Sequence, residues 1–273
     1  MRISVELVPR NSADLLTDAT TVRAVMPEAS AFNIPDLSRF SLRSWEACAL
    51  TSKHLPSIPH IRAMDIPPGD EIPLAHTILE SGLSEVLVIQ GDPPHDLSQR
   101  TYPHTSVDII RRFKKHHPEL KVFAAYDPYR QSFQDELKAL SRKFEAGADG
   151  IFTQPIFDLR LLEICAEMLR GQNVFWGIAP VLGDRSRSYW ETTNKIVFPS
   201  DFRSTLDWNR EFAKSALRVI RSLQANVYFM PIRVDLAKYL TGLAGEGADE
   251  PRCRTNRSRY EPENALVERD ASG

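Results

Sequence analysis

The stretch DELKALSRKFEAGADGIFTQPIFDLRLLEICAEMLRG, residues 135–171, contains a complete helix–strand–helix unit. Residues 135–148 are predicted to form an amphipathic helix, because apolar side chains recur at helical spacing and Gly147 stands where a C-terminal cap belongs. Residues 150–154 form a short apolar run typical of a buried strand, and residues 158–171 repeat the helical pattern. Helices that alternate with buried strands indicate a parallel sheet, since parallel neighbours need a crossover connection.

Seven other short apolar runs along the chain are also predicted strands, separated by segments with helical spacing. They span residues 3–8, 29–34, 57–63, 85–90, 121–126, 174–179 and 227–232. Eight β-then-α units in a chain of about 250 residues match a closed (β/α)₈ TIM barrel. The competing doubly wound fold usually has a glycine-rich turn after its first strand, and this chain has ELVPRNS there. We therefore predict a single barrel domain over residues 1–243, with extra helix in the long connection 182–224.

Composition narrows the class of protein further. The 273 residues carry a formal net charge of −2, which provides no field to attract nucleic acid or an anionic membrane. No apolar run approaches the roughly 20 residues that span a bilayer, and the first ten residues do not read as a signal peptide. The three cysteines are far apart and form no metal-binding spacing. We expect a cytoplasmic protein without a metal site, and we expect its polar tail, residues 244–273, to be disordered.

Polar side chains gather where the predicted strands end, which is where a barrel of this kind places its active site. This set comprises Glu6, Asn33, His60, Asp65, Gln90, Asp92, Tyr126, Asp127 and Gln154. The chain has no nucleophile elbow, no zinc-protease helix and no P-loop, so those chemistries lack support. A carboxyl group on the first strand suits general acid catalysis if burial raises its pKa.

Each of these residues also has a purely structural interpretation. Glu6 could form a buried salt bridge with Arg10 or Arg62, and His60 could be a core histidine with satisfied hydrogen bonds. Asp92 could cap the turn that follows its strand, and Tyr126 could simply pack. Convergence of several polar groups on one rim favours a functional site over these separate interpretations.

Six motifs, in order along residues 5–240, resemble those of the methylenetetrahydrofolate reductase family, the flavin-dependent TIM-barrel enzymes of one-carbon metabolism. They are VELVPR at 5–10, IPHIRAMD at 58–65, VIQGDPP at 88–94, AAYDPY at 124–129, RKFEAGADGIFTQPIFD at 142–158 and GIAPV at 177–181. The fifth is the most specific.

The resemblance implies an oxidoreductase that reduces 5,10-methylenetetrahydrofolate to 5-methyltetrahydrofolate, for methionine biosynthesis, with NAD(P)H as the reductant and FAD as the carrier. It implies that Glu6 protonates N10 of the folate, that Asp92 lies beside both the flavin and the pterin, and that Gln154 hydrogen-bonds the pterin. The residues implied to bind the flavin are Asn33, His60, Gln90, Gly91, Asp92, Tyr126, Arg142 and Lys143.

The chain also departs from the family pattern, mainly in the residues implied to hold the flavin. Gln90 replaces an arginine, Asn33 replaces a threonine, and Ala139 replaces an asparagine. The loop after Tyr126 is shorter and lacks a histidine, and no aromatic residue follows the GIAPV strand near Gly183. We therefore expect weak FAD binding. The alternatives are hydride transfer directly from nicotinamide, a methyltetrahydrofolate-oxidising enzyme, and a folate-binding barrel without turnover. The sequence does not distinguish NADH from NADPH as the reductant, and it does not show whether the chain forms a homo-oligomer.

Overall fold

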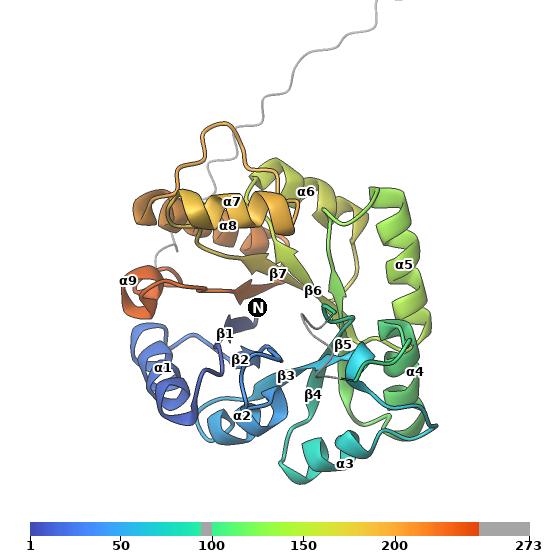
Figure 1. The fold of residues 1–273 in the computed structure, drawn as a ribbon. Helices are drawn as coiled ribbons and strands as arrows, with labels where there is room; N and C mark the ends of the chain where they lie inside the picture. Colours follow the sequence, from blue (N-terminus) through green and yellow to red (C-terminus); the bar gives the residue numbers. More distant parts are fainter. Residues whose placement is uncertain (94–99, 246–273) are drawn as a thin grey trace, which may run out of the picture.

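A computed structural model describes residues 1–93 and 100–245 of the chain. Eight parallel strands close into a barrel in chain order (Figure 1), which confirms the predicted (β/α)₈ architecture. The strands are β1 (Ile3–Glu6), β2 (Ala31–Ile34), β3 (Ser57–Arg62), β4 (Glu85–Ile89), β5 (Lys121–Tyr126), β6 (Gly150–Pro155), β7 (Val174–Ile178) and β8 (Asn226–Phe229). The barrel closes where β8 pairs with β1, with Tyr228 opposite Ser4.

Helices surround the barrel on its outside (Figure 1). They are α1 (Ser12–Val25), α2 (Ser44–Thr51), the 3-10 turn η1 (Ala63–Asp65), α3 (Pro73–Glu80), α4 (Ser106–His116), α5 (Phe133–Glu145), α6 (Leu159–Met168), α7 (Asp184–Thr193), α8 (Leu206–Ser222) and α9 (Leu236–Leu240). Both α7 and α8 lie in the long connection 182–224, where extra helix was predicted.

Local sequence signals explain the bounds of these elements. Helix α5 begins after Ser132, whose hydroxyl accepts a hydrogen bond from Asp135 N, and Gly147 beyond its end has φ +103°. That left-handed conformation favours glycine and confirms the predicted cap. Strand β8 ends at Phe229, shorter than predicted, because Pro231 has no N–H to extend the ladder.

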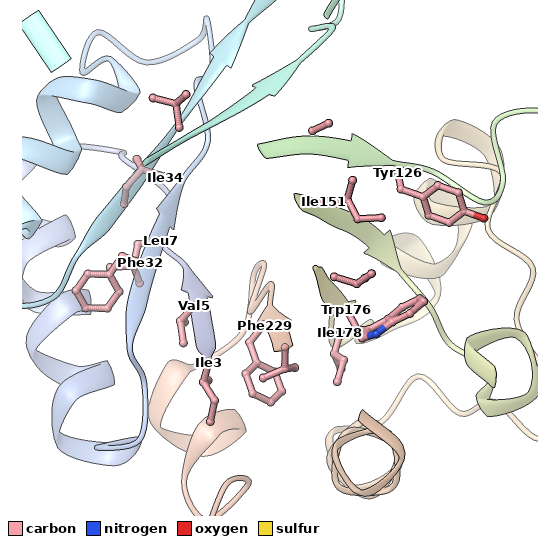
Figure 2. Close-up of a cluster of buried hydrophobic side chains, with 14 of the residues drawn as sticks. Ile3, Val5, Leu7, Phe32, Ile34, Tyr126, Ile151, Trp176, Ile178 and Phe229 are labelled. Atoms are coloured by element: carbon pink, nitrogen blue, oxygen red, sulfur yellow. The ribbon is translucent and has the colours of Figure 1, made fainter. Parts of the chain in front are cut away.

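Alternation along the strands sorts the apolar side chains into two layers. One layer fills the barrel interior and includes Leu87, Phe123, Phe152 and Phe175. The other layer faces the helices. Figure 2 shows members of this outer layer, including Ile3, Val5, Leu7, Phe32, Ile34, Tyr126, Ile151, Trp176, Ile178 and Phe229. The inner layer lies directly beneath the carboxyl ends of the strands, and a site there would rest against it.

The C-terminal end of the described chain is attached to the barrel. Leu243 and Ala244 are buried, and the Ala244 carbonyl accepts a hydrogen bond from Arg221 on α8. The predicted disordered tail falls mainly on residues 246–273, which lie outside the described residues. Within residues 1–93 and 100–245, none of the helices has the length and apolar character required to cross a membrane.

Candidate active site

Two adjoining hollows open at the carboxyl ends of the strands. A central cavity of about 300 Å³ lies over the barrel interior, with Glu6 and His60 in its wall. A cleft of about 350 Å³ runs beside it over β2 to β5 and includes Asp92 and Lys143. Both have Gln154 in the wall that they share. Their volumes are in the range of small-molecule sites in proteins.

Glu6 ends β1 and points into the barrel, two residues after the inward-facing Ser4. Its side chain is 9% exposed, and the Tyr228 hydroxyl donates a hydrogen bond to its Oε2. Burial raises the pKa of Glu6 from 4.5 to about 7, although the hydrogen bond from Tyr228 opposes that rise. A carboxyl group that holds its proton up to neutral pH has the property that a general acid needs.

The salt-bridge interpretation of Glu6 does not agree with the structure. Arg10 lies 3.9 Å from Asp18 on α1, and Arg62 lies 3.4 Å from Asp65. Among the described residues, no cation forms an ion pair with Glu6. The carboxyl group is therefore buried without a compensating charge, and its ionised form lowers the stability of the folded chain.

His60 and Asn33 form a buried polar chain on the next two strands. Asn33 Nδ2 lies 3.3 Å from His60 Nε2, and the Ser4 hydroxyl donates to Asn33 Oδ1 at 2.6 Å. Burial lowers the pKa of His60 to about 3, so the imidazole is neutral at physiological pH. His60 lines the central cavity, whereas Asn33 is fully buried behind it.

The turn after β4 carries Gln90, Gly91 and Asp92, which all line the cleft. The amide of Gln90 is fully engaged with the following loop, since it donates to the His104 carbonyl and accepts from Ser106 N. Asp92 is exposed toward the cleft.

Arg62 holds this turn from β3. Its Nη2 donates to the Asp92 carbonyl at 2.7 Å. Gly91 has φ +84°, and a Cβ there would lie 2.9 Å from Arg62 Nε. Glycine at 91 therefore serves both the turn and the close approach of the guanidinium. Arg62, which also pairs with Asp65, therefore holds the backbone of this turn in place.

The remaining predicted site residues divide between the cleft and other parts of the molecule. Lys143 lines the cleft and its Nζ donates to the Ala125 carbonyl at 2.6 Å. Tyr126 points outward from β5, where its hydroxyl lies 3.9 Å from Cys165 Sγ (Figure 2). Arg142 is exposed on α5 and lines neither hollow. The two hollows are lined by Glu6, His60, Gln90, Gly91, Asp92, Lys143 and Gln154. Asn33 contacts His60 from behind the central cavity, whereas Tyr126 and Arg142 lie away from both hollows.

Several lining residues were missed by the sequence analysis. Tyr228 stands in an apolar strand, and only the closure of the barrel brings it to Glu6. Tyr189 on α7 is 53% exposed and lines the central cavity, although no aromatic residue was found close after the GIAPV strand. Arg39 lines both hollows from the loop after β2, and Arg233 lines the central cavity. The described residues include no group of three or more His, Cys, Asp or Glu side chains arranged to hold a metal ion.

Comparison with solved structures supports the barrel fold. An uncharacterized protein from Clostridium thermocellum, described as binding two copies of 5-methyl-5,6,7,8-tetrahydrofolic acid, aligns with a TM-score of 0.54 at 10% identity, over 85% of this chain and 90% of that one. Dihydropteroate synthase from Xanthomonas albilineans, in complex with 7,8-dihydropteroate, aligns with a TM-score of 0.51 at 12% identity, over 89% and 91%. At these identities the likeness shows a common fold.

Sequence comparison identifies the family. The 5,10-methylenetetrahydrofolate reductase of Escherichia coli strain K12 is 25% identical over 151 residues, which cover 54% of this chain and 51% of that protein. The enzyme of the same name from Salmonella typhimurium is 23% identical over the same length. The chain thus matches about half the length of these relatives. A sequence profile described as methylenetetrahydrofolate reductase matches residues 38–220, more than half of the chain, so the chain belongs to the methylenetetrahydrofolate reductase family.

Proposed function

We propose that this chain is an oxidoreductase that converts 5,10-methylenetetrahydrofolate to 5-methyltetrahydrofolate with NAD(P)H as the reductant. The observation that carries the proposal is the buried carboxyl group of Glu6, which has no counter-charge among the described residues and faces a cavity of about 300 Å³ at the mouth of the barrel. Membership of the family and the names of its bacterial relatives support the substrate. In this function the protein would work in the cytoplasm and supply methyl groups for methionine biosynthesis.

Glu6 would act on the ring of the bound folate that joins N5 and N10. Its carboxyl group donates a proton to N10, the bond between N10 and the methylene carbon breaks, and the methylene stays on N5 as an electrophile. A hydride delivered to that carbon completes the methyl group. Gln154, in the wall that the two hollows share, would donate and accept hydrogen bonds at the pterin, and neutral His60 would contact the ligand without adding charge.

The cleft over β2 to β5 offers basic side chains to the phosphates of a dinucleotide cofactor, although Asp36, Asp92, Asp127 and Glu136 line the same cleft. Arg39, Arg130 and Lys143 line it, and burial lowers the pKa of Lys143, although the nearby carboxylates Glu136 and Asp127 oppose that shift. Basic side chains of this kind hold phosphate oxygens by charge-assisted hydrogen bonds. FAD, if bound there, would supply a carrier for the hydride that moves between the nicotinamide and the folate. Asp92 would lie near the ring end of the cleft, and Lys143 with Arg39 and Arg130 would hold the phosphates.

The altered contacts predict weak binding of that cofactor. Gln90 is occupied by its own loop, and Tyr126 and Arg142 do not reach the cleft. Each charge-assisted hydrogen bond that is lost weakens binding by about 1.5–3 kcal/mol, which is about one to two orders of magnitude in Kd. We expect a protein that purifies largely colourless and binds FAD on titration. No binding at saturating FAD, with folate reduction retained, would establish direct transfer from nicotinamide instead.

The role of Glu6 is tested by Glu6→Gln, which removes the proton but keeps an oxygen that accepts from Tyr228. We expect folate reduction to fall by about 10²–10⁴-fold, while nicotinamide-dependent reduction of an artificial acceptor persists. The matched control is Glu163→Gln, the same change on the exposed face of α6. Normal folate turnover by Glu6→Gln would refute the assignment, and assaying both directions of the reaction would test whether the enzyme runs mainly as an oxidase.

A further inference from the structure

Tyr228 lies deep in the barrel interior and has one polar partner. Its side chain is 3% exposed, and its ring packs edge-to-face on Phe152 with 5.2 Å between the ring centroids. Among the described residues, its hydroxyl hydrogen-bonds Glu6 Oε2 and nothing else. Burial first, and the nearby Glu6 second, raise the pKa of this phenol well above its ordinary value, so the hydroxyl keeps its hydrogen at every pH of interest. That hydrogen needs an acceptor, and Glu6 Oε2 is the one that the structure provides.

The two oxygens of Glu6 are therefore not equivalent. Oε2 accepts from Tyr228, whereas Oε1 has no hydrogen-bond donor among the described residues and is not fully buried. Since Glu6 lines the central cavity, Oε1 is the oxygen that a ligand there can reach. A proton on Oε2 would compete with the phenol hydrogen for the same space, so the proton of the neutral acid belongs on Oε1.

We propose that Tyr228 is the positioning residue of this site: it occupies Oε2, fixes the transferable proton of Glu6 on Oε1 toward the cavity, and stabilises the carboxylate that transfer leaves behind. The second effect follows from the strength of a hydrogen bond to an ionised acceptor compared with a neutral one. The inference rests on the proposed function for its consequence in catalysis, but the coupling between the two side chains can be measured without turnover.

Other charged groups do not account for this coupling. The remaining titratable side chains in the cavity wall are His60 on β3, Arg39 in the loop after β2, Tyr189 on α7, and Arg233 in the segment after β8. Arg10, Asp18 and Asp235 line a second hollow between α1 and α9, and Glu6 contributes to the wall of that hollow as well. The pKa of Glu6 responds to burial and to the Tyr228 hydrogen bond rather than to any of these groups.

The test measures the titration of Glu6 directly. Infrared difference spectra between the wild type and Glu6→Gln isolate the carboxyl band of Glu6, and the same subtraction in a Tyr228→Phe background isolates it without the phenol. We expect the midpoint to rise by about one to two pH units in Tyr228→Phe, because the hydrogen bond that favours the carboxylate is lost. Replacing Tyr228 with 3-fluorotyrosine strengthens the donor and should move the midpoint the other way. A disturbance of folding would not produce opposite shifts.

Kinetics supply the second readout. In Tyr228→Phe the alkaline limb of the kcat profile should move to higher pH, and kcat on the plateau should fall by about tenfold, with the folate KM changed less than about twofold. Tyr239→Phe, which removes a buried phenol hydroxyl outside the barrel interior, is the control and should leave both readouts unchanged. An unchanged or lowered Glu6 midpoint in Tyr228→Phe would overturn the proposal. If the Tyr228 variants show the predicted titration shifts but the wild type does not reduce methylenetetrahydrofolate, only the proposed function fails.

Discussion

Burying Glu6 without a counter-charge should make the folded protein less stable as pH rises, and Glu6→Gln should remove that effect. The folded chain holds the Glu6 proton up to a pKa of about 7, whereas the unfolded chain releases it near 4.5. Between these values the unfolded state binds fewer protons, so the free energy of unfolding decreases with increasing pH. Above about pH 7 the free energy of unfolding has lost the whole of this contribution, and below about pH 4.5 it has lost none of it.

The magnitude follows from the distance between the two pKa values. At about 1.4 kcal/mol for each pKa unit, ionised Glu6 destabilises the fold by about 3 kcal/mol, a large part of the stability of an ordinary domain. Glutamine keeps the acceptor for Tyr228 and carries no charge. The stability of Glu6→Gln relative to wild type should therefore be near zero at about pH 4.5 and about +3 kcal/mol above pH 7.

Urea unfolding at about pH 5 and about pH 8 measures this difference. Titration of His60 changes stability in the opposite direction over part of the same range, but it is common to both proteins and cancels. Glu163→Gln, the same substitution on an exposed surface, should leave stability unchanged at both pH values. A Glu6→Gln effect of the same size at both pH values would refute the reasoning, because it would have no connection with ionisation.

Three further changes test other parts of the structure. Gly91→Ala should destabilise the fold by at least about 1 kcal/mol and weaken FAD titration, because φ is +84° and the new Cβ would lie 2.9 Å from Arg62 Nε; normal binding would show that the turn can move. His60→Gln should flatten the acid side of the stability profile, since the folded-state pKa of His60 is depressed to about 3 and wild-type stability falls as pH drops through the range below 6.5; urea unfolding at acid pH decides this. A chain ending at Gly245 should keep its melting temperature and activity, because residues 246–273 are poor in large apolar side chains; a drop in either would contradict this.

The barrel was predictable because each strand is a short apolar run followed by a helical pattern. The positions of Glu6, Asp92 and Gln154 near the carboxyl ends of strands followed from the same division of the chain. The direction in which the Tyr126 side chain points could not be predicted in this way. In KVFAAY every residue but the first is apolar or aromatic, so the sequence does not show which set faces inward. The structure has Phe123 and Ala125 facing the barrel interior and the cavity, which turns Tyr126 outward.

The partners of the site residues were also beyond reach of the sequence, since they depend on register between distant segments. Gln90 is engaged by the loop that leads into α4, and Arg62 crosses from β3 to the turn after β4. Tyr189 is brought to the cavity by a helix inserted after β7 rather than by the strand itself. Each contact is set by how a loop folds back on the rim, and no short motif encodes it.

The hydrogen bond between Tyr228 and Glu6 joins residues 222 positions apart, on the last and the first strands of the barrel. A contact of such sequence separation forms only when nearly the whole chain has been made and has folded. In an unfolded chain, Glu6 has neither the burial nor the Tyr228 hydrogen bond that set its pKa in the closed barrel. The infrared band of this one carboxyl group therefore reports barrel closure, and following it in a refolding experiment would show when β8 pairs with β1.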